Sequence, residues 1–383
     1  MKLSKLMLSA CVAALALVAC NKENPQEFPA NNNLKSVEIS LENVIFTKAD
    51  GGDRIVDGQS VNLKNFKIFF TDGLTFFPVY DENHQPIAST YYTALPAQNT
   101  ALSFHFIDPK VTNVVIVANM GDVNYADMNV LKAATLDINK QQDQKELALY
   151  GNEPLAATNR VHEYYEDDGS AAQTTVYEAK VKLAPRIARI EIDGFHCYFT
   201  PESPNYNEIN ITQIAFNDYY SGTYLWNGTE TGNVMNVNDA SQPDIFDYFA
   251  ANAALNPVPW YADVLDVTLT PTAPTVEGLN IAYSFFPSAS TQTVYPQLFI
   301  QLTADDHVGY LVTKSLKDNA TQSTITEFKE GYIYRMRVSD IDGDGTPDEV
   351  LPFDEEDIQT LDRCIEVFVE VVQWTVNYIT PEF

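Results

Sequence analysis

The stretch Val37-Glu38-Ile39-Ser40-Leu41-Glu42 alternates apolar and polar residues without a break. Because successive side chains of a β-strand point to opposite faces, this alternation predicts a strand with one buried and one exposed face. The same period recurs along the chain between clusters of Gly, Pro, Asn and Asp, a pattern that favours sandwiches of short strands. Further strands are expected at residues 65–70, 111–118, 175–183, 188–192, 281–286, 297–302, 332–338 and 365–374.

One segment departs from this period. Residues 126–136 space their apolar side chains as a helix does, which predicts one short helix on a crossover connection. Pro185 lies just ahead of the strand-like residues 186–192 and marks the best domain boundary, since proline can end a strand. We therefore expect an all-β chain with one short helix and two tandem β-sandwich domains, residues 35–185 and 186–383.

The beginning of the chain has the composition of an export signal. Two lysines precede an apolar run at residues 6–19, which closes on Leu17-Val18-Ala19-Cys20. The run is shorter than the roughly 20 apolar residues of a spanning helix, so we interpret residues 1–19 as a lipoprotein signal peptide. Cys20 would then be the lipidated first residue, and the polar residues 20–34 would form a flexible tether. The alternative is an ordinary signal peptide with a chance cysteine.

The chain is strongly acidic. It has 23 Lys and Arg against 52 Asp and Glu, a formal net charge of −29 at pH 7. A charge of this sign repels nucleic acid, so we expect no nucleic-acid partner. A solubilising exterior explains the acidity without any specific ligand.

Cysteines give little covalent support to the fold. Of the 4 cysteines, Cys11 lies in the expected signal peptide and Cys20 is the expected lipidated residue, which leaves Cys197 and Cys364. Export permits a bridge between these two, and two buried thiols are the alternative. Stability is therefore expected to come from core packing.

The sequence lacks the residue spacings that mark common catalytic sites. No histidine pair has ligand spacing, and neither a Gly-x-Ser-x-Gly elbow nor a glycine-rich phosphate loop occurs. We therefore expect no enzyme, with a glycosidase hidden among the loops as the alternative. The histidines are His84, His105, His162, His196 and His307.

A group of aromatic residues has two interpretations. It could form a platform for sugar rings, or it could fill the core or the rim of a β-sandwich. The residues are Tyr219, Tyr220, Tyr224, Trp226, Trp260 and Tyr261.

One acidic loop has the spacing of a calcium site. Its acids stand at positions 1, 3, 5 and 9 and Gly345 stands at position 6, as in a calcium-binding loop. Position 12 is Leu351 and not the usual Glu. We expect a structural Ca²⁺ site, or else a plain acidic hairpin. The candidate ligands are Asp340, Asp342, Asp344 and Asp348.

Several segments, taken in order, resemble the fimbrillin family, the FimA-like major subunits of type V pili. The resemblance covers most of the chain after Cys20. It is carried by the lipobox and by residues 114–121, 147–154, 186–190, 331–338 and 369–374.

This resemblance implies a fold and a processing step. Family members have two β-sandwich domains of transthyretin-like topology and reach the cell outer membrane as lipoprotein precursors. A trypsin-like protease then removes the first strand. The matching place here is Lys48 and Ala49, although Arg is usual at the first position. Alternatives are a cut after Arg54, no cut, or an ordinary surface lysine at this place.

The resemblance also suggests how subunits join. Removing the strand around residues 37–46 would open an apolar groove with unpaired backbone groups, which recruits another strand. The C-terminal strand is the expected donor, because its alternation is unbroken; the alternative is that residues 365–374 pair within their own domain. The donor residues are Ile365, Val367, Val369 and Val371 on one face and Trp374 on the other.

These expectations define a function and its alternatives. We expect a structural pilin of a cell-surface fimbrium that polymerises with other fimbrial subunits and supports adhesion to host or bacterial surface ligands. A fimbrial anchor and a tip adhesin are the alternatives within the family. A monomeric glycan-binding surface lipoprotein is the alternative outside it.

Overall fold

The computed structural model describes residues 33–41, 44–48, 60–93, 101–141, 147–166, 169–200, 204–235, 261–279, 281–287, 295–305, 307–318, 320–336, 350–359, 363–373 and 375–380. Strands dominate these residues, and the expectation of an all-β chain with one short helix is confirmed. No helix within these ranges has the length and apolar character needed to cross a bilayer.

Two sheets packed against each other form the first half of the chain. Phe70 and Phe104 come from opposite sheets and meet in the core with ring centroids 5.0 Å apart. The first sheet has the order β11 (Ala156–Tyr165), β12 (Ala171–Val181), β1 (Lys35–Leu41) and β7 (Leu102–Ile107). The second has the order β13 (Ala184–Pro185), β10 (Leu149–Pro154), β8 (Asn113–Ala118), β4 (Phe66–Thr71) and β5 (Phe76–Phe77), with β6 (Tyr91–Tyr92) also on β4.

A 9-stranded sheet forms most of the second half. Its order is β19 (Tyr261–Leu269), β16 (Ile209–Asn217), β22 (Gln297–Ala304), β23 (His307–Asp318), β27 (Arg363–Gln373), β25 (Tyr332–Met336), β14 (Ala188–Ile192) and β21 (Ile281–Phe285), with β24 (Ser323–Thr324) on β23. A 3-stranded sheet accompanies it, with the order β20 (Thr275–Val276), β15 (Phe195–Tyr198) and β26 (Leu351–Asp354).

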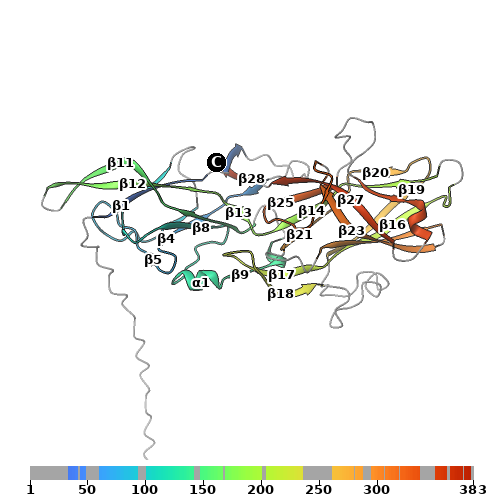
Figure 1. Ribbon diagram of the computed structural model, residues 1–383, viewed down its shortest axis with the longest axis horizontal. Helices are drawn as coiled ribbons and strands as arrows, with labels where there is room; N and C mark the ends of the chain where they lie inside the picture. The colour runs from blue at the N-terminus through green and yellow to red at the C-terminus, as the bar shows by residue number, and fades with distance from the viewer. Residues whose placement is uncertain are drawn as a thin grey trace, which may run out of the picture.

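Two further 3-stranded sheets connect the halves. One has the order β18 (Glu230–Met235), β17 (Tyr219–Tyr224) and β9 (Thr135–Asp137), and the other has the order β2 (Val44–Lys48), β28 (Thr375–Thr380) and β3 (Ser60–Asn62). The molecule is elongated, with β1, β11 and β12 towards one end and β16, β19 and β23 towards the other (Figure 1). The boundary at Pro185 falls between the sheets of the two halves, and the two-domain division stays a prediction.

The helix α1 (Met128–Lys132) lies inside the predicted range of residues 126–136. Asp127 caps it, because its Oδ1 accepts from the backbone N–H groups of Asn129 at 2.8 Å and Val130 at 2.9 Å. Leu131 is buried against the core. The helix is shorter than expected because the chain then turns into β9, which pairs with β17.

Arg186 holds the junction between the halves. Its Nε donates to the carbonyl of Leu225 at 2.8 Å and its Nη2 to that of Trp226 at 2.7 Å. Its Nη1 pairs with Glu330, and its guanidinium carbon lies 4.6 Å from the ring centroid of Tyr150. One side chain thus connects β10, the β17–β18 hairpin and the loop before β25.

The predicted strands are confirmed, with shifted ends. Each expected range overlaps one of β1, β4, β8, β12, β14, β21, β22, β25 and β27. The burial patterns agree with the residue types, since β4 and β8 are mostly apolar and are buried on both faces, whereas β22 alternates. Other strands were not predicted from the sequence, among them β7, β11, β16, β17, β18, β19, β23, β26 and β28.

Candidate functional site

Strand β1 lies inside its sheet with both edges paired. It runs parallel to β12 from Lys35 opposite Thr175 to Leu41 opposite Val181, and antiparallel to β7. Its apolar face is part of the core, with Val37 0% and Ile39 1% exposed. We call the space that β1 fills the β1 slot. If β1 left, this slot would expose apolar side chains between two unpaired backbone edges.

Lys35 fixes the start of β1. Its Nζ donates to the carbonyl of Val111 at 2.7 Å and lies 4.8 Å from the ring centroid of Tyr177. Partial burial lowers the pKa of Lys35 from its ordinary value, and Asp108 opposes this shift. The ammonium group therefore meets both a carbonyl and an aromatic face at the mouth of the slot.

A polar cluster surrounds Ser36. The Ser36 Oγ lies 2.5 Å from Thr174 Oγ1 and 3.1 Å from His105 Nδ1, and the His105 ring stacks on His162 with centroids 3.7 Å apart. The four side chains come from the four strands of the sheet, so β1 is bonded across the sheet as well as along its backbone. Burial and the neighbouring His162 lower the pKa of His105, while Glu82 and Glu38 oppose the shift.

Glu38 fixes the register of β1 at the surface. Arg160 on β11 holds its carboxylate with two bonds, Nη1 to Oε1 at 3.0 Å and Nη2 to Oε2 at 2.9 Å. The same Nη2 lies 2.5 Å from Glu178 Oε1 on β12. Because these groups are partly exposed, the ion pairs contribute to register more than to stability.

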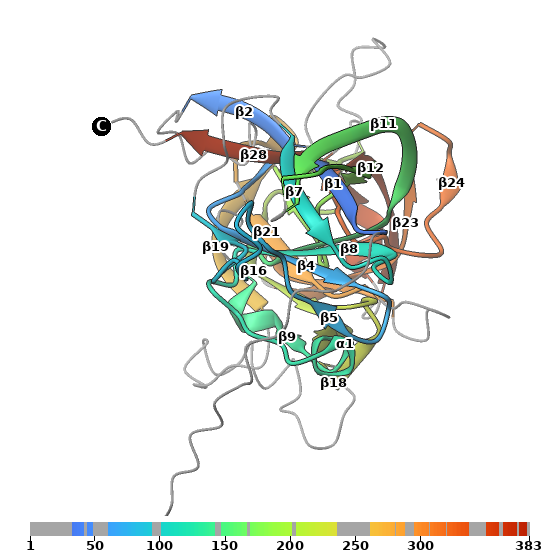
Figure 2. The same ribbon diagram turned by 90° about the vertical axis from the view of Figure 1, so that its left-hand side faces the viewer.

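Strand β28, from the last part of the sequence, pairs with two strands from the first part. It runs parallel to β2, from Val44 opposite Val376 to Lys48 opposite Thr380, and parallel to β3 on its other edge. Figure 2 shows β2 and β28 side by side at one side of the molecule. Strand β28 thus lies between β2 and β3, the two strands that follow β1 in the sequence.

The structure describes only part of the predicted site. Lys48 ends β2. Residues Ile365, Val367, Val369 and Val371 belong to β27, which pairs with β23 and with β25 in its own sheet. Val367 and Val369 are both 0% exposed. The residues that lie outside the described ranges are Cys20, Ala49, Trp374, Asp340, Asp342, Asp344 and Asp348.

The described residues bring together few groups with chemical reactivity. Within these ranges, no three His, Cys, Asp or Glu side chains are placed to hold a metal ion. Cys197 is a free, buried thiol, and burial raises its pKa above the ordinary value, with Glu355, Asp354 and Asp357 adding to the shift. A thiol in this state is a packing residue and not a nucleophile.

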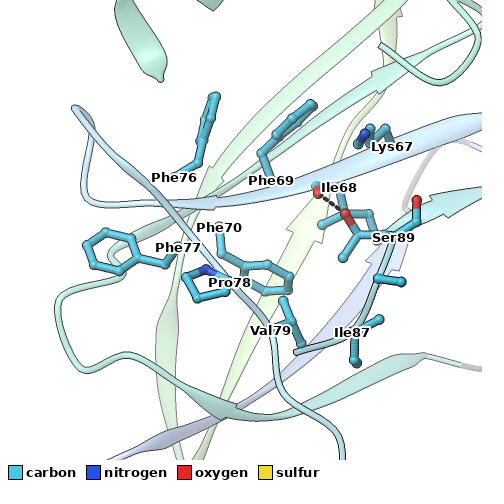
Figure 3. Close-up of a pocket in the computed structure, with 12 residues that line it drawn as sticks. Lys67, Ile68, Phe69, Phe70, Phe76, Phe77, Pro78, Val79, Ile87 and Ser89 are labelled. Carbon is cyan, nitrogen blue, oxygen red and sulfur yellow. Dashed lines mark hydrogen bonds between the residues drawn. The ribbon is translucent and has the colours of Figure 1, made fainter. Parts of the chain in front are cut away.

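A cavity of about 150 Å³ lies beside β4. It is lined mostly by apolar side chains of residues 68–70, 76–79 and 87–88 (Figure 3). Lys67 at its edge already donates to Asp122 at 2.7 Å and to Asn124 at 2.5 Å. The cavity therefore offers apolar contact and no free charge.

The described aromatics of the predicted sugar platform take structural positions. Tyr219 is 3% exposed and stacks on Phe216 with centroids 5.4 Å apart. Trp226 meets Tyr150 at 5.9 Å and Lys132 at 4.9 Å, at the junction of the halves. These contacts agree with the alternative that the aromatics belong to the core and its rim.

Sequence reasoning missed the stacked His105 and His162 and the separate strand β28. The two histidines are 57 positions apart and lack ligand spacing, so only the sheet order brings them together. For β28, the one available signal was its position beyond Trp374 at the end of an alternating run.

Comparison with known proteins shows the fold. No protein-family model and no curated protein matches the chain. Among solved structures, a protein of Parabacteroides distasonis assigned to cell adhesion is 12% identical, with 91% of this chain and 99% of that chain covered and a TM-score of 0.53. A fimbrilin (FimA) of Porphyromonas gingivalis is 12% identical over 90% and 98% of the two chains, with a TM-score of 0.47. The tip fimbrial protein Mfa3 of Porphyromonas gingivalis is 12% identical over 89% and 99%, with a TM-score of 0.37.

The first of these similarities carries the structural argument. At a TM-score of 0.53 over 91% of the chain, the protein has the fold of the Parabacteroides distasonis protein. The expectation of an all-β architecture is thereby confirmed at the level of the fold.

Proposed function

We propose that the chain is a structural subunit of a cell-surface fimbrium that supports adhesion, and that it joins other subunits by strand exchange after losing β1. The observation that carries this proposal is that β1, the first described strand, fills a core position and is followed by β2, which ends on Lys48. The fold shared with a protein assigned to cell adhesion supports the same conclusion. In this proposal the chain is not an enzyme.

Loss of β1 and β2 would create a strong acceptor site for a strand of another subunit. A cut after Lys48 separates β1 and β2, which we call the leader strands, from the rest of the chain. Burial of Val37 and Ile39 contributes about 3 to 6 kcal/mol gross, at about 1.5 to 3 kcal/mol for each side chain. An incoming strand with similar residues would regain this term and the backbone bonds on both edges. Because slot and donor differ, the contact is heterologous and propagates into a fibre.

Among the C-terminal residues, β28 is the part best suited to leave. Strand β27 is paired with β23 over Arg363–Val369 and with β25 over Glu370–Gln373, and Val367 and Val369 are fully buried. Pulling it out would open the largest sheet. Strand β28 belongs to a 3-stranded sheet, and its pairing partners there are β2 and β3, of which the cut would remove β2. In this proposal β27 stays in its own sheet, and β28, which follows it, is the strand that enters the other subunit.

The exported precursor would be held at the outer membrane by a lipid on Cys20 until the cut. A subunit that escapes the cut would keep its lipid and act as an anchor, whereas a cut subunit would serve in the stalk or at the tip. Calcium at Asp340, Asp342, Asp344 and Asp348 would stiffen one loop, and a higher melting temperature with calcium than with chelator would support this site.

The test is cleavage of the full precursor by a lysine-specific protease, followed by sizing and electron microscopy. We expect the cut protein to form oligomers and fibres, and the Lys48→Ala precursor to stay monomeric under the same protease. If material shown to begin at Ala49 remains a folded monomer at high concentration, strand exchange is refuted.

A further inference from the structure

The cavity beside β4 lies where pairing along one edge of β4 is interrupted. On this edge β6 pairs with the first two residues of β4, and β5 pairs with the last two. Between them the backbone N–H of Ile68 donates to the carbonyl of Thr90 at 3.1 Å, and the Thr90 hydroxyl donates to the carbonyl of Ile68 at 2.6 Å. The chain leaves the edge after β5 and returns just before β6, and both passages line the cavity (Figure 3).

Hydrogen bonds fix the two passages relative to each other. The backbone N–H of Ile87 donates to the carbonyl of Val79 at 2.7 Å, directly beside the cavity. Asp81 orders the turn that joins the passages, because its Oδ1 accepts from the backbone N–H groups of Asn83 and Gln85, each at 2.9 Å. The cavity is therefore preformed in the fold.

Aromatic packing keeps the walls in place. Phe70 is 1% exposed and meets Phe104 of the opposite sheet with ring centroids 5.0 Å apart. Phe69 meets Phe76 at 4.7 Å and Tyr125 at 5.8 Å. A cavity closes only as far as its lining can move inward, and these rings are already packed on neighbours. The space therefore stays open.

Polar groups at the cavity already have partners. Lys67 carries the one charge among the described lining residues, and its Nζ is held by Asp122 at 2.7 Å and Asn124 at 2.5 Å. The Ser89 Oγ at the rim accepts from the backbone N–H of Tyr91 at 3.1 Å. A water molecule is held well only where about two to four polar partners meet it, and these walls offer few. An apolar ligand that displaces such water gains affinity.

The size of the cavity suits a single ring. Its volume is about 150 Å³. An apolar cavity of about this volume in another protein stays dry and binds benzene. The rim at residues 87–89 is exposed, with Ile87 39% exposed, so a ligand can enter from solvent. The net charge of −29 disfavours an anionic ligand.

We propose that this cavity binds an uncharged aromatic molecule with one ring, which lies against Phe70 and Val79 and directs any hydroxyl towards Ser89 at the rim. The site is separate from the strands of the proposed strand exchange, because β5 lies away from β2 and β28 (Figure 1, Figure 2). Protein cut after Lys48 and uncut protein should therefore bind the ligand equally well.

Methyl NMR of the full chain with labelled Ile and Val side chains tests the site. Benzyl alcohol is the probe, since it is a neutral single ring with one hydroxyl. We expect its ring to shift the methyl signals of Ile87 and Val79, with a dissociation constant of about 1 mM or lower. The methyl signal of Ile300, which is 0% exposed in the second half of the chain, should not move.

Two further probes test the class of ligand on the same protein. Benzoate has the same ring with a charge that finds no free cation in the cavity, and indole has a second ring that exceeds the space. Both should bind at least about tenfold more weakly than benzyl alcohol. Equal affinity for benzoate or for indole would overturn the proposed ligand class.

A substitution at the rim tests the location. Ile87→Trp adds bulk at the opening and should weaken benzyl alcohol binding at least about tenfold. The matched control is Val161→Trp, since Val161 on β11 is also exposed, at 53%, and does not line the cavity; its affinity should equal that of the parent. The proposal is overturned if the Ile87 and Val79 signals of the parent do not move at about ten times the expected dissociation constant. It is also overturned if folded Ile87→Trp binds as the parent does.

Discussion

Replacing Ile39 by alanine should weaken the precursor and accelerate its assembly. Ile39 is 1% exposed and lies opposite the small Ala179 on β12, so little neighbouring bulk can fill the space that its side chain leaves. A buried Ile→Ala change costs about 2 to 5 kcal/mol. The loss falls on the precursor alone, because the assembled subunit no longer contains residue 39.

The same substitution should raise the rate of assembly after the cut while it lowers the stability of the precursor. If leader release limits assembly, a loss of about 2 kcal/mol in leader binding speeds release by up to about 30-fold, at tenfold for each 1.4 kcal/mol. Urea unfolding of the precursor gives the stability, with a midpoint shift on the order of 1 M. Light scattering after the cut gives the assembly rate. The Ser40→Ala variant is the control, since Ser40 is exposed on the same strand.

Two results would refute this reasoning. An Ile39→Ala precursor as stable as the parent would mean that β1 does not occupy the core. A weakened precursor that assembles no faster than the Ser40→Ala control would mean that leader release does not limit assembly.

Three further predictions concern other parts of the fold. Arg186→Ala should lower the free energy of unfolding by about 2 to 4 kcal/mol in a urea titration, because two carbonyls and Glu330 lose their partner; Arg186→Lys should recover only part of this, since Lys lacks the planar fork. Because the pKa of His105 is lower in the folded chain than its ordinary 6.5, the neutral form is favoured by folding. Precursor stability should therefore be complete above about pH 6.5 and fall with acid below it, and the melting temperature of His105→Gln should fall less; equal acid sensitivity would contradict this. Cys197 should resist a thiol reagent at pH 8 until urea unfolds the chain, and rapid labelling of the folded protein would show that it is not buried.

Alternation and apolar runs predicted much of the fold because burial imposes them locally. β1 and β22 each have one buried and one more exposed face, and their sequences alternate accordingly. β4 and β8 are buried on both faces, and their sequences are mostly apolar, with Lys67 and Thr71 in β4 and Asn113 in β8 as the exceptions. The helix α1 was predictable from its spacing, and its early end was not, since pairing of the next residues with β17 decides it.

The missed elements depend on contacts between distant segments. β11 lies at a sheet edge with most side chains exposed, so burial imposes little pattern on it. β28 pairs with β2 and β3, which lie more than 300 positions earlier in the sequence. The candidate site could be predicted as a removable first strand, whereas the cluster around Ser36 depends on four strands meeting in one sheet.

The most direct test of the central claim is N-terminal sequencing of subunits recovered from assembled fibres. The account predicts that these subunits begin at Ala49, directly after β2, and lack the lipidated Cys20. Fibres whose subunits still contain β1, with a start at Cys20 or anywhere up to Lys35, would contradict it.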